Sequence, residues 1–421
     1  MTVNFKLTGL RTYRLQGGSH SDKANDLLEE HNRVLEGVLS ATNFNDKDRL
    51  PDSTLSKLIL HFSKLRLRNE DLEEPDILGR AYEYLIGEFA DDAGKKGGEF
   101  YTPKEVVSLL VEILDPQEGM YVCDPACGSG GMLVQTVYHL KSVHQNYKNV
   151  VLHGQEKNIG TWAICKMNML LHGIGGARIE KGDTIREPKL MQKGKLIEYD
   201  TVIANPPFSL KNWGIEVAGN DPFNRFKYGI PPKSYGDYAF VQHMIAVLKP
   251  SGKAGVILPH GALFRGGAEG KIRKGILEED IVEAVIGLPP NLFYGASIPA
   301  CLFIINKKKS ARNKGKVFFL YGARDFLQGK KQNKLRPEDI DKIVSAYRSN
   351  ATVGKYCRPV LLDEIRRNDY NLNITRYIDI TEQEASIDVQ KTIDELTRLK
   401  KERASAEEKV ESHLKYLGYK I

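Results

Sequence analysis

Apolar residues recur at helical spacing through the N-terminal part of the chain. The pattern covers residues 24–39 (ANDLLEEHNRVLEGVL), 53–67 (STLSKLILHFSKLRL) and 76–92 (DILGRAYEYLIGEFADD). Each stretch places apolar side chains on one face of a helix and charged ones on the other, which predicts amphipathic helices. Gly97-Gly98 then breaks the pattern. We therefore expect residues 1–96 to form an N-terminal helical region.

Short apolar runs alternate with helical stretches from residue 120 onward. This alternation predicts an α/β fold, a Rossmann-like, doubly wound and mostly parallel sheet, over residues 97–380. The expected strands are 121–123, 150–153, 201–204, 254–258, 281–286, 301–305 and 317–321, and the expected helices are 132–144, 161–172, 238–248 and 271–278.

Residues 381–421 form a charged segment with a helical pattern. Its apolar positions fall on one stripe: Val389, Ile393, Leu396, Leu399, Val410, Leu414 and Leu417. This C-terminal helical tail either packs on its own domain or docks on another chain, and the pattern alone leaves both open.

Composition limits the class of protein. The 61 Lys and Arg residues against 54 Asp and Glu give a net charge of +7, which permits a nucleic-acid partner without requiring one. No apolar run is long enough to span a bilayer, and no secretory leader opens the chain. The five cysteines form no CxxC pair, and the histidines lack metal-ligand spacing with them. We expect a reduced, cytoplasmic protein with no metal site and no membrane partner.

The carboxyl ends of the predicted strands carry candidate ligand residues, because open α/β sheets bind ligands at that edge. Asp124 ends the first strand, and Gly128, Gly130 and Gly131 then form a tight loop before a helix. Such a loop lets backbone approach a ligand closely. Leu133 stands where a nicotinamide fingerprint needs its third glycine, and no GxxxxGK[ST] motif is present. A nicotinamide oxidoreductase is thereby disfavoured.

Three more strand ends carry polar or rigid residues. Glu156 follows the second strand, where an acid can accept both ribose hydroxyls. Asp183, after the third, could accept an amine from an adenine ring. The apolar run 201–204 ends in Asn205-Pro206-Pro207-Phe208. Two prolines remove two backbone donors and fix two φ angles, so this corner is rigid and rich in carbonyl acceptors.

These motifs resemble those of S-adenosylmethionine-dependent N6-adenine DNA methyltransferases. DPACGSGGML, GQEKN, GDT and NPPF, preceded by GGEFYTP, are most similar to the modification (M) subunit of type I restriction-modification systems, the HsdM family. Residues 227–243 (KYGIPPKSYGDYAFVQH) and 286–307 (IGLPPNLFYGASIPACLFIINK) are more specific to that family. The resemblance runs from about residue 75 to the end, and the helical N-terminal region is shorter than the family usually has.

The resemblance implies a catalytic role for the proline corner. The Asn205 side-chain oxygen and the Pro206 carbonyl would accept hydrogen bonds from the amine of an adenine flipped out of DNA. Pro207 would keep the corner rigid, and Phe208 would stack on the base. Phe293 would be the second aromatic residue, although core packing explains it as well.

The resemblance also implies a binding site for S-adenosylmethionine. The segment EFYTPK would lie across the methionine end, the glycine loop would contact the cofactor through its backbone, and the acids would hold the nucleoside. Thr102-Pro103 could equally begin a helix. The expected cofactor residues are Glu99, Phe100, Tyr101, Thr102, Pro103, Lys104, Asp124, Ala126, Gly128, Ser129, Gly130, Gly131, Glu156 and Asp183.

Macromolecular partners follow from the same resemblance. It implies double-stranded DNA, a specificity (S) subunit, a second modification subunit and, in the full complex, a restriction (R) subunit. Residues 221–237 interleave basic and aromatic side chains, so Arg225, Lys227 and Tyr228 are candidate DNA contacts, or part of an ordinary mobile loop. Alternatives are amino-methyl transfer to cytosine N4, RNA adenine or protein glutamine, and a catalytically idle DNA-binding assembly subunit. Without a Pro-Cys pair, C5-cytosine chemistry is excluded.

Overall fold

The computed structural model describes residues 18–65, 71–72, 76–93, 101–294, 298–381 and 389–419. The chain divides into two compact units, Met1–Ile378 and Asp379–Ile421. The N-terminal helices and the sheet belong to the first unit, and the C-terminal helix belongs to the second.

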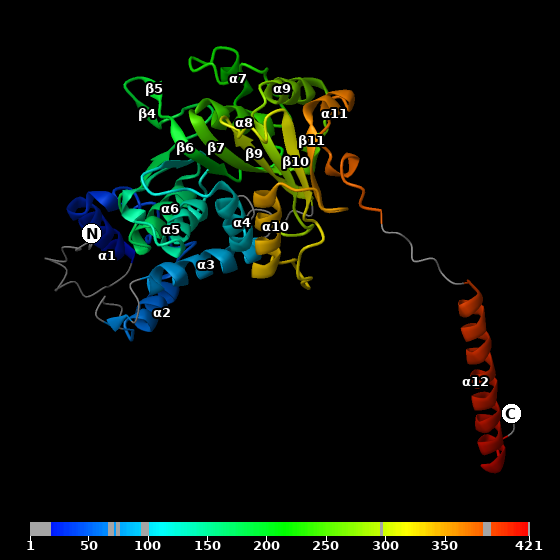
Figure 1. Ribbon diagram of the computed structural model, residues 1–421. Helices are drawn as coiled ribbons and strands as arrows, with labels where there is room; N and C mark the ends of the chain where they lie inside the picture. Colours follow the sequence, from blue (N-terminus) through cyan, green and yellow to red (C-terminus); the bar gives the residue numbers. More distant parts are fainter. Residues whose placement is uncertain are drawn as a thin grey trace. The chain divides into compact units, whose positions relative to one another are not determined.

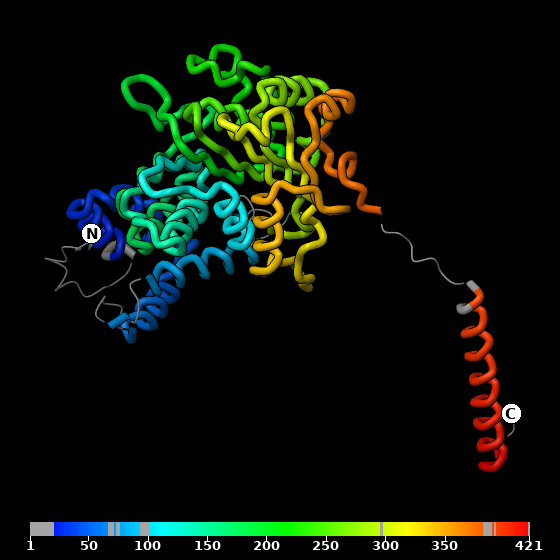
Figure 2. The backbone as a smooth tube through the Cα atoms, in the orientation of Figure 1, coloured from blue at the N-terminus to red at the C-terminus, as the bar shows by residue number. Residues whose placement is uncertain are grey.

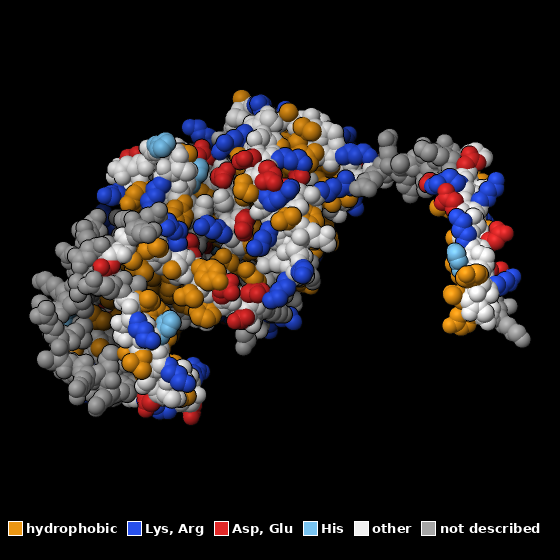
Figure 3. Space-filling view, turned by 90° about the horizontal axis from the view of Figure 1, so that it is seen from below, with side chains coloured by type: hydrophobic (Ala, Val, Ile, Leu, Met, Phe, Trp, Pro, Cys, Tyr) orange, Lys and Arg blue, Asp and Glu red, His pale blue; other side chains and the backbone are white. Residues whose placement is uncertain are grey.

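The N-terminal helices are α1 (Gly18–His31), α2 (Asp52–Phe62) and α3 (Ile77–Ala93). Helix α3 packs beside α6 (Ile159–Leu171), and Asp76 at its start accepts hydrogen bonds from Tyr138 and His172 at 2.6 and 2.7 Å. Figure 2 shows α3 running along the outer side of the helices that cover the sheet. Apolar side chains gather on the face seen in Figure 3; those exposed on α2 and α3 are Leu58, Leu60, Phe62, Tyr84, Leu85 and Phe89.

A nine-stranded sheet forms the centre of the first unit, with strand order β11-β10-β8-β9-β7-β6-β1-β2-β3. Strands β3, β2, β1, β6 and β7 run parallel, as do β8 and β10, whereas β9 and β11 are antiparallel to their neighbours. The strands are β1 (Tyr121–Asp124), β2 (Val151–Glu156), β3 (Arg178–Lys181), β6 (Tyr199–Ala204), β7 (Leu248–Pro259), β8 (Val282–Gly287), β9 (Ala300–Asn306), β10 (Lys316–Tyr321) and β11 (Cys357–Leu361). The doubly wound, mostly parallel sheet expected from the sequence is confirmed.

Helices cover both faces of this sheet (Figure 1). One layer contains α4 (Lys104–Leu114), α5 (Gly131–Ser142), α6 and α10 (Pro337–Ser349), and the other contains α8 (Asp237–Ala246) and α9 (Gly267–Glu278). Helix α4 contributes Leu109 and Leu110, both fully buried, to the main core between its layer and the sheet. Burying a leucine side chain contributes about 1.5–3 kcal/mol, so this layer fixes α4 firmly against the strands.

The strand order reverses at β1. The chain passes from β1 to β2 and β3 on one side, and β6 and β7 then add on the other side. In parallel sheets such a reversal opens a crevice beyond the carboxyl ends of the two central strands. Asp124 and Ala204 are the last residues of β1 and β6, so the glycine loop and the proline corner both begin at this crevice.

The second unit contains one long helix, α12 (Val389–Tyr416). Its side chains are exposed wherever the structure describes them, except for the half-buried Leu414. Ile393, Leu396, Leu399 and Val410 are each about half exposed. Ion pairs four residues apart, such as Arg398 with Glu402, support the helix locally.

Candidate active site

A cavity at the reversal point brings together residues from three separate segments. The segment before α4 contributes two of them, the loop after β1 contributes most of the rest, and the end of β6 contributes one. The predicted site residues that line the cavity are Tyr101, Thr102, Asp124, Ala126, Gly128, Ser129, Gly131 and Asn205. Strands β1 and β6 are parallel neighbours in the sheet, so the loop after β1 and the end of β6 lie side by side although they are far apart in the sequence.

At Gly130, the backbone of the glycine loop adopts a conformation that only glycine accommodates. Its φ is +83°, and an added Cβ would lie 2.8 Å from the Cys165 Sγ. Gly130 is also the N-cap of α5 and supplies no side-chain cap, so the first amides of α5 are not covered by a capping side chain. The carboxylate of Asp124 accepts the Ala126 N–H at 3.0 Å and so closes the loop at its start.

Glu156 holds the other side of this loop. One carboxylate oxygen accepts the Gly128 N–H at 3.0 Å, and the other accepts the Asn158 N–H at 2.7 Å. Burial raises the pKa of Glu156, and burial likewise raises the pKa of Asp124 to about 8, with the nearby Glu156 charge adding to that increase. Two desolvated acids beside one cavity favour a ligand that carries positive charge.

The raised pKa of Asp124 predicts a pH-dependent stability. A carboxyl group that binds its proton more tightly in the folded chain stabilises the fold fully below its ordinary pKa of 3.8, and that contribution is lost as the pH rises to about 8. Asp124→Asn cannot ionise but keeps an oxygen for Ala126. We expect the variant to melt a few degrees above wild type at about pH 8.5, and the difference to shrink toward about pH 5.

Circular dichroism melts of the two proteins across this range measure the effect. Asp26→Asn, which removes an exposed carboxylate from α1, is the matched control and should show no pH-dependent difference. A melting difference between Asp124→Asn and wild type that stays constant across the range would contradict the raised pKa.

Asn205 is oriented by Thr102. The Asn205 Nδ2 donates to the Thr102 Oγ1 at 2.9 Å, although the two residues are 103 positions apart. The Asn205 Oδ1 is buried and has no hydrogen-bond partner among the described residues. Thr102 does not cap α4, whose N-cap is Pro103. An unpartnered buried acceptor is costly, so its presence beside a cavity points to a donor supplied by a ligand.

Two aromatic side chains meet next to this acceptor. The rings of Phe208 and Phe293 lie edge to face, with centroids 5.6 Å apart and an interplanar angle of 71°. Phe293 is buried, whereas Phe208 is partly exposed. The structure thus brings together the pair that the sequence singled out, and it leaves Phe208 as the one available to a planar ligand.

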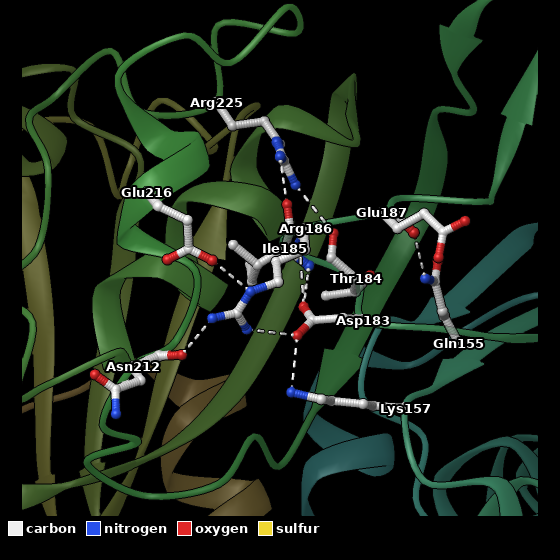
Figure 4. A network of polar contacts seen from close by, with 10 residues as sticks. All are labelled: Gln155, Lys157, Asp183, Thr184, Ile185, Arg186, Glu187, Asn212, Glu216 and Arg225. Atoms are coloured by element: carbon white, nitrogen blue, oxygen red, sulfur yellow. Dashed lines mark hydrogen bonds and ion pairs between the residues drawn. The ribbon is translucent and has the colours of Figure 1, made fainter.

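Asp183 lies in a polar network outside the cavity lining (Figure 4). One oxygen accepts the backbone N–H groups of Ile185 and Arg186 at 3.0 and 3.1 Å. The other accepts the Arg186 Nη1 at 2.9 Å and pairs with the Lys157 Nζ at 3.0 Å. Burial acts to raise the pKa of Asp183, but these donors outweigh it and lower the pKa. A ligand amine could reach this carboxylate only by displacing exposed Lys157.

Arg225 is not placed to contact DNA, which contradicts that prediction. Its side chain is 2% exposed and pairs with the buried Asp221. The guanidinium also donates to the carbonyl oxygens of Thr184 and Ile185 at 3.0 and 2.8 Å (Figure 4). Because it fixes the loop after β6 to the loop after β3, its role is structural.

Lys227 and Tyr228 are more accessible and share one partner. The Lys227 Nζ and the Tyr228 hydroxyl donate to Glu279 at 2.8 and 2.6 Å. A phosphate would have to replace Glu279 as their acceptor, so their DNA contact stays a prediction.

Of the other predicted residues, Lys104 begins α4, and Glu99 and Phe100 lie outside the described residues.

Comparison with known proteins decides the family. The sequence profile of the N-6 DNA methylase family matches residues 73–386. The chain belongs to this family. The resemblance and the enzyme class predicted from the sequence, an adenine-specific DNA methyltransferase, are confirmed.

Curated relatives and a solved structure agree with the N-6 DNA methylase assignment. The methylase subunit of the type I restriction enzyme HindI from Haemophilus influenzae is 35% identical over 419 residues, which cover 94% of this chain and 92% of that protein. The MjaVII methylase subunit from Methanocaldococcus jannaschii is 37% identical over 389 residues; the match covers 90% of this chain, which spans 65% of the relative's length. A type I methyltransferase subunit from Streptococcus thermophilus superposes with a TM-score of 0.77 at 35% identity, covering 85% of this chain and 76% of that one.

The structure of this N-6 DNA methylase also reveals a supporting residue that sequence reasoning missed. Asp237, 1% exposed at the start of α8, accepts the Ser209 N–H at 2.9 Å directly behind Phe208. Arg265 donates to its other oxygen at 2.5 Å. An acid at the head of a mostly apolar helix was the available signal. Within the described residues, no helix is long and apolar enough to cross a membrane, and no group of metal-ligating side chains is found.

Proposed function

We propose that this chain transfers a methyl group from S-adenosylmethionine to the N6 atom of an adenine flipped out of DNA, as the modification subunit of a type I restriction-modification system. The observation that carries the proposal is the buried, unpartnered Asn205 Oδ1 at the end of β6, which faces the same cavity as the glycine loop. An acceptor fixed in this way suits the hydrogens of an exocyclic amine.

The cofactor fits the donor set around the first cavity. S-adenosylmethionine supplies an electrophilic methyl group on a positively charged sulfonium. The desolvated Asp124 and Glu156 favour that charge, Glu156 accepts the ribose hydroxyls, and the uncapped start of α5 offers amides. Asp183 accepts the adenine amine once Lys157 has moved aside. Tyr101 and Thr102 cover the methionine side, with Glu99, Phe100 and Pro103 in the same segment.

The proline corner holds the target base for attack. The adenine lone pair is delocalised into the ring, and two acceptors aimed at the amine hydrogens draw the nitrogen toward tetrahedral geometry. The Asn205 Oδ1 and the Pro206 carbonyl take these roles, and Pro207 keeps them fixed, so little reorganisation is needed during the reaction. Phe208 stacks on the flipped base, and the buried Phe293 supports the Phe208 ring edge to face.

The proposed organisation has three parts. Residues 1–96 form the helical region, residues 97–380 the methyltransferase domain and residues 381–421 the docking tail. The relatives are named as subunits of type I restriction enzymes. We accordingly infer a cytoplasmic assembly on double-stranded DNA with a specificity subunit, a second modification subunit and, in the full complex, a restriction subunit.

A product analysis tests the proposed function. Assembled with its specificity subunit, the chain should transfer tritium-labelled methyl groups to duplex DNA, because the Asn205 corner presents its acceptors to an exocyclic amine. Digestion to nucleosides and chromatography should place the label in N6-methyldeoxyadenosine. Label in N4-methyldeoxycytidine, RNA or protein would contradict the adenine assignment. Tight S-adenosylmethionine binding without any transfer would favour an idle assembly subunit.

A further inference from the structure

Asp237 belongs to a buried network of two acids and one arginine. Asp237 is the first residue of α8, Glu269 lies in the first turn of α9, and both are 1% exposed. Arg265 lies between the two acids. Its Nη2 donates to Asp237 at 2.5 Å and to Glu269 at 3.0 Å, and its Nε donates to Glu269 at 2.5 Å. The network therefore fixes the start of α8 to the start of α9.

The surroundings of Arg265 hold its guanidinium group in one orientation. The guanidinium carbon lies 4.2 Å from the centroid of the Tyr235 ring. An added Cβ at Gly261 would force the Arg265 Nη1 to move, so glycine leaves the room that the guanidinium needs. Burial raises the pKa of Asp237 and of Glu269, and the Arg265 charge opposes the rise at both acids. The arginine thus has a defined place and two acids that depend on it.

The network reaches the backbone that follows the proline corner. Ser209 has a φ of +51°, a left-handed conformation that residues other than glycine adopt only at an energetic cost. One Asp237 oxygen accepts the Ser209 N–H at 2.9 Å and holds the backbone in this conformation, while the other oxygen is bound by Arg265. Because Phe208 directly precedes Ser209, the turn at residue 209 determines where the Phe208 ring lies.

We propose that Asp237 and Arg265 are positioning residues for the target base. They hold Ser209 in its left-handed conformation and thereby keep the Phe208 ring where it stacks on a flipped adenine. The proposal rests on the proposed function, which assigns the stacking role to Phe208. Neither Asp237 nor Arg265 lines the cavity beside the glycine loop, so their effect on the reaction passes through the backbone of the corner. Glu269 acts one step further away, as the second anchor of the guanidinium.

Asp237→Asn tests this role in the enzyme assembled with its specificity subunit. An amide has one oxygen, so it cannot accept from both Ser209 and Arg265. We expect methyl transfer to duplex DNA to fall about 10- to 100-fold, the effect of displacing a positioned group by about 1 Å. Binding of S-adenosylmethionine should stay within about twofold of wild type, and so should binding of duplex DNA, whose affinity comes largely from the phosphate backbone. The remaining Arg265–Glu269 pair is balanced in charge, so the fold should persist, and circular dichroism melts verify this.

Two readouts distinguish positioning from general structural support. 2-Aminopurine at the target position fluoresces more strongly when it leaves the base stack, and Asp237→Asn should reduce that rise by about half or more. Adding Ser209→Gly to Asp237→Asn should raise the transfer rate about threefold or more, because glycine adopts the left-handed conformation without strain. Glu278→Gln, which breaks an exposed ion pair with Arg366 at the other end of α9, is the matched control and should behave as wild type in every measurement.

Three results would overturn the positioning role. The first is an Asp237→Asn enzyme with an unchanged transfer rate and fluorescence rise, the second is a loss of cofactor binding as large as the loss of rate, and the third is no recovery with Ser209→Gly. Arg265→Lys keeps the charge but cannot bridge two carboxylates with one planar fork, so it should show the same losses and provides the same test if Asp237→Asn does not fold. A wild-type assembly that transfers no methyl group to DNA would instead overturn the proposed function and, with it, this role.

Discussion

Asn205→Ala should lower the rate of methyl transfer by roughly 10²- to 10³-fold or more and leave the cofactor dissociation constant within about twofold of wild type. The substitution removes the buried, unpartnered Oδ1 that we assign to the target amine, and the side-chain hydrogen bond lost with it goes to Thr102 and not to the glycine loop. Initial rates of tritium transfer to duplex DNA by the assembled enzyme measure the first quantity. Calorimetric titration with S-adenosylmethionine measures the second.

Two further substitutions sharpen this result. Asn205→Asp keeps an acceptor but loses the donor to Thr102, so it should retain partial activity. Asn220→Ala, an exposed change in the following loop, is the matched control and should leave the rate unchanged. Near-wild-type transfer by Asn205→Ala would remove the acceptor role from the proposal, and a matching loss of cofactor binding would show that the corner is structural.

Deleting residues 385–421 should abolish assembly with the specificity subunit while the first unit stays folded and binds cofactor. The reason is the surface of α12, whose Ile393, Leu396, Leu399 and Val410 are about half exposed and form one apolar stripe. Such a stripe suits a helical partner. Size-exclusion chromatography with light scattering should show two modification subunits with one specificity subunit for the full chain, and separate species for the truncated one.

A pair of substitution variants separates the stripe from the length of the tail. Leu396→Glu with Leu399→Glu should also prevent assembly, because two charges would enter the apolar contact. Asp394→Lys with Glu402→Lys changes the charged side of the same helix and should assemble normally. Full assembly by the truncated chain would show that α12 has no docking role.

Local sequence patterns were sufficient to predict most of the helices and strands. They did not predict features that depend on contacts between distant parts of the chain. The apolar runs from 121 to 321 predicted seven strands of the sheet. Strand β3 (RIEK) was predicted only through its end before Asp183, without a range of its own, and strand β11, which contains Pro359, was not predicted, because neither is an apolar run. The strand order was also out of reach, since periodicity does not say that β9 inserts between β7 and β8.

The site shows the same division. The glycine loop and the proline corner could be located because a backbone conformation constrains which residues occupy it. The Thr102–Asn205 contact could not, because the two residues are 103 positions apart and no pattern links them. Arg225 was misjudged because a basic side chain among aromatic residues reads the same whether it faces phosphate or is buried. Asp221, four residues earlier, was the available clue to burial.

That buried pair limits how the loop after β6 can evolve. The side chains of Asp221 and Arg225 are 3% and 2% exposed. Removing either residue would therefore leave the other charge buried without a partner, which costs about 3–5 kcal/mol of stability. Arg225 also satisfies two carbonyl oxygens of the loop after β3, which ties the two segments together. Neither position can change alone without a large loss of stability. A new loop would have to arrive by simultaneous replacement of both residues, or by exchange of the whole segment between related chains.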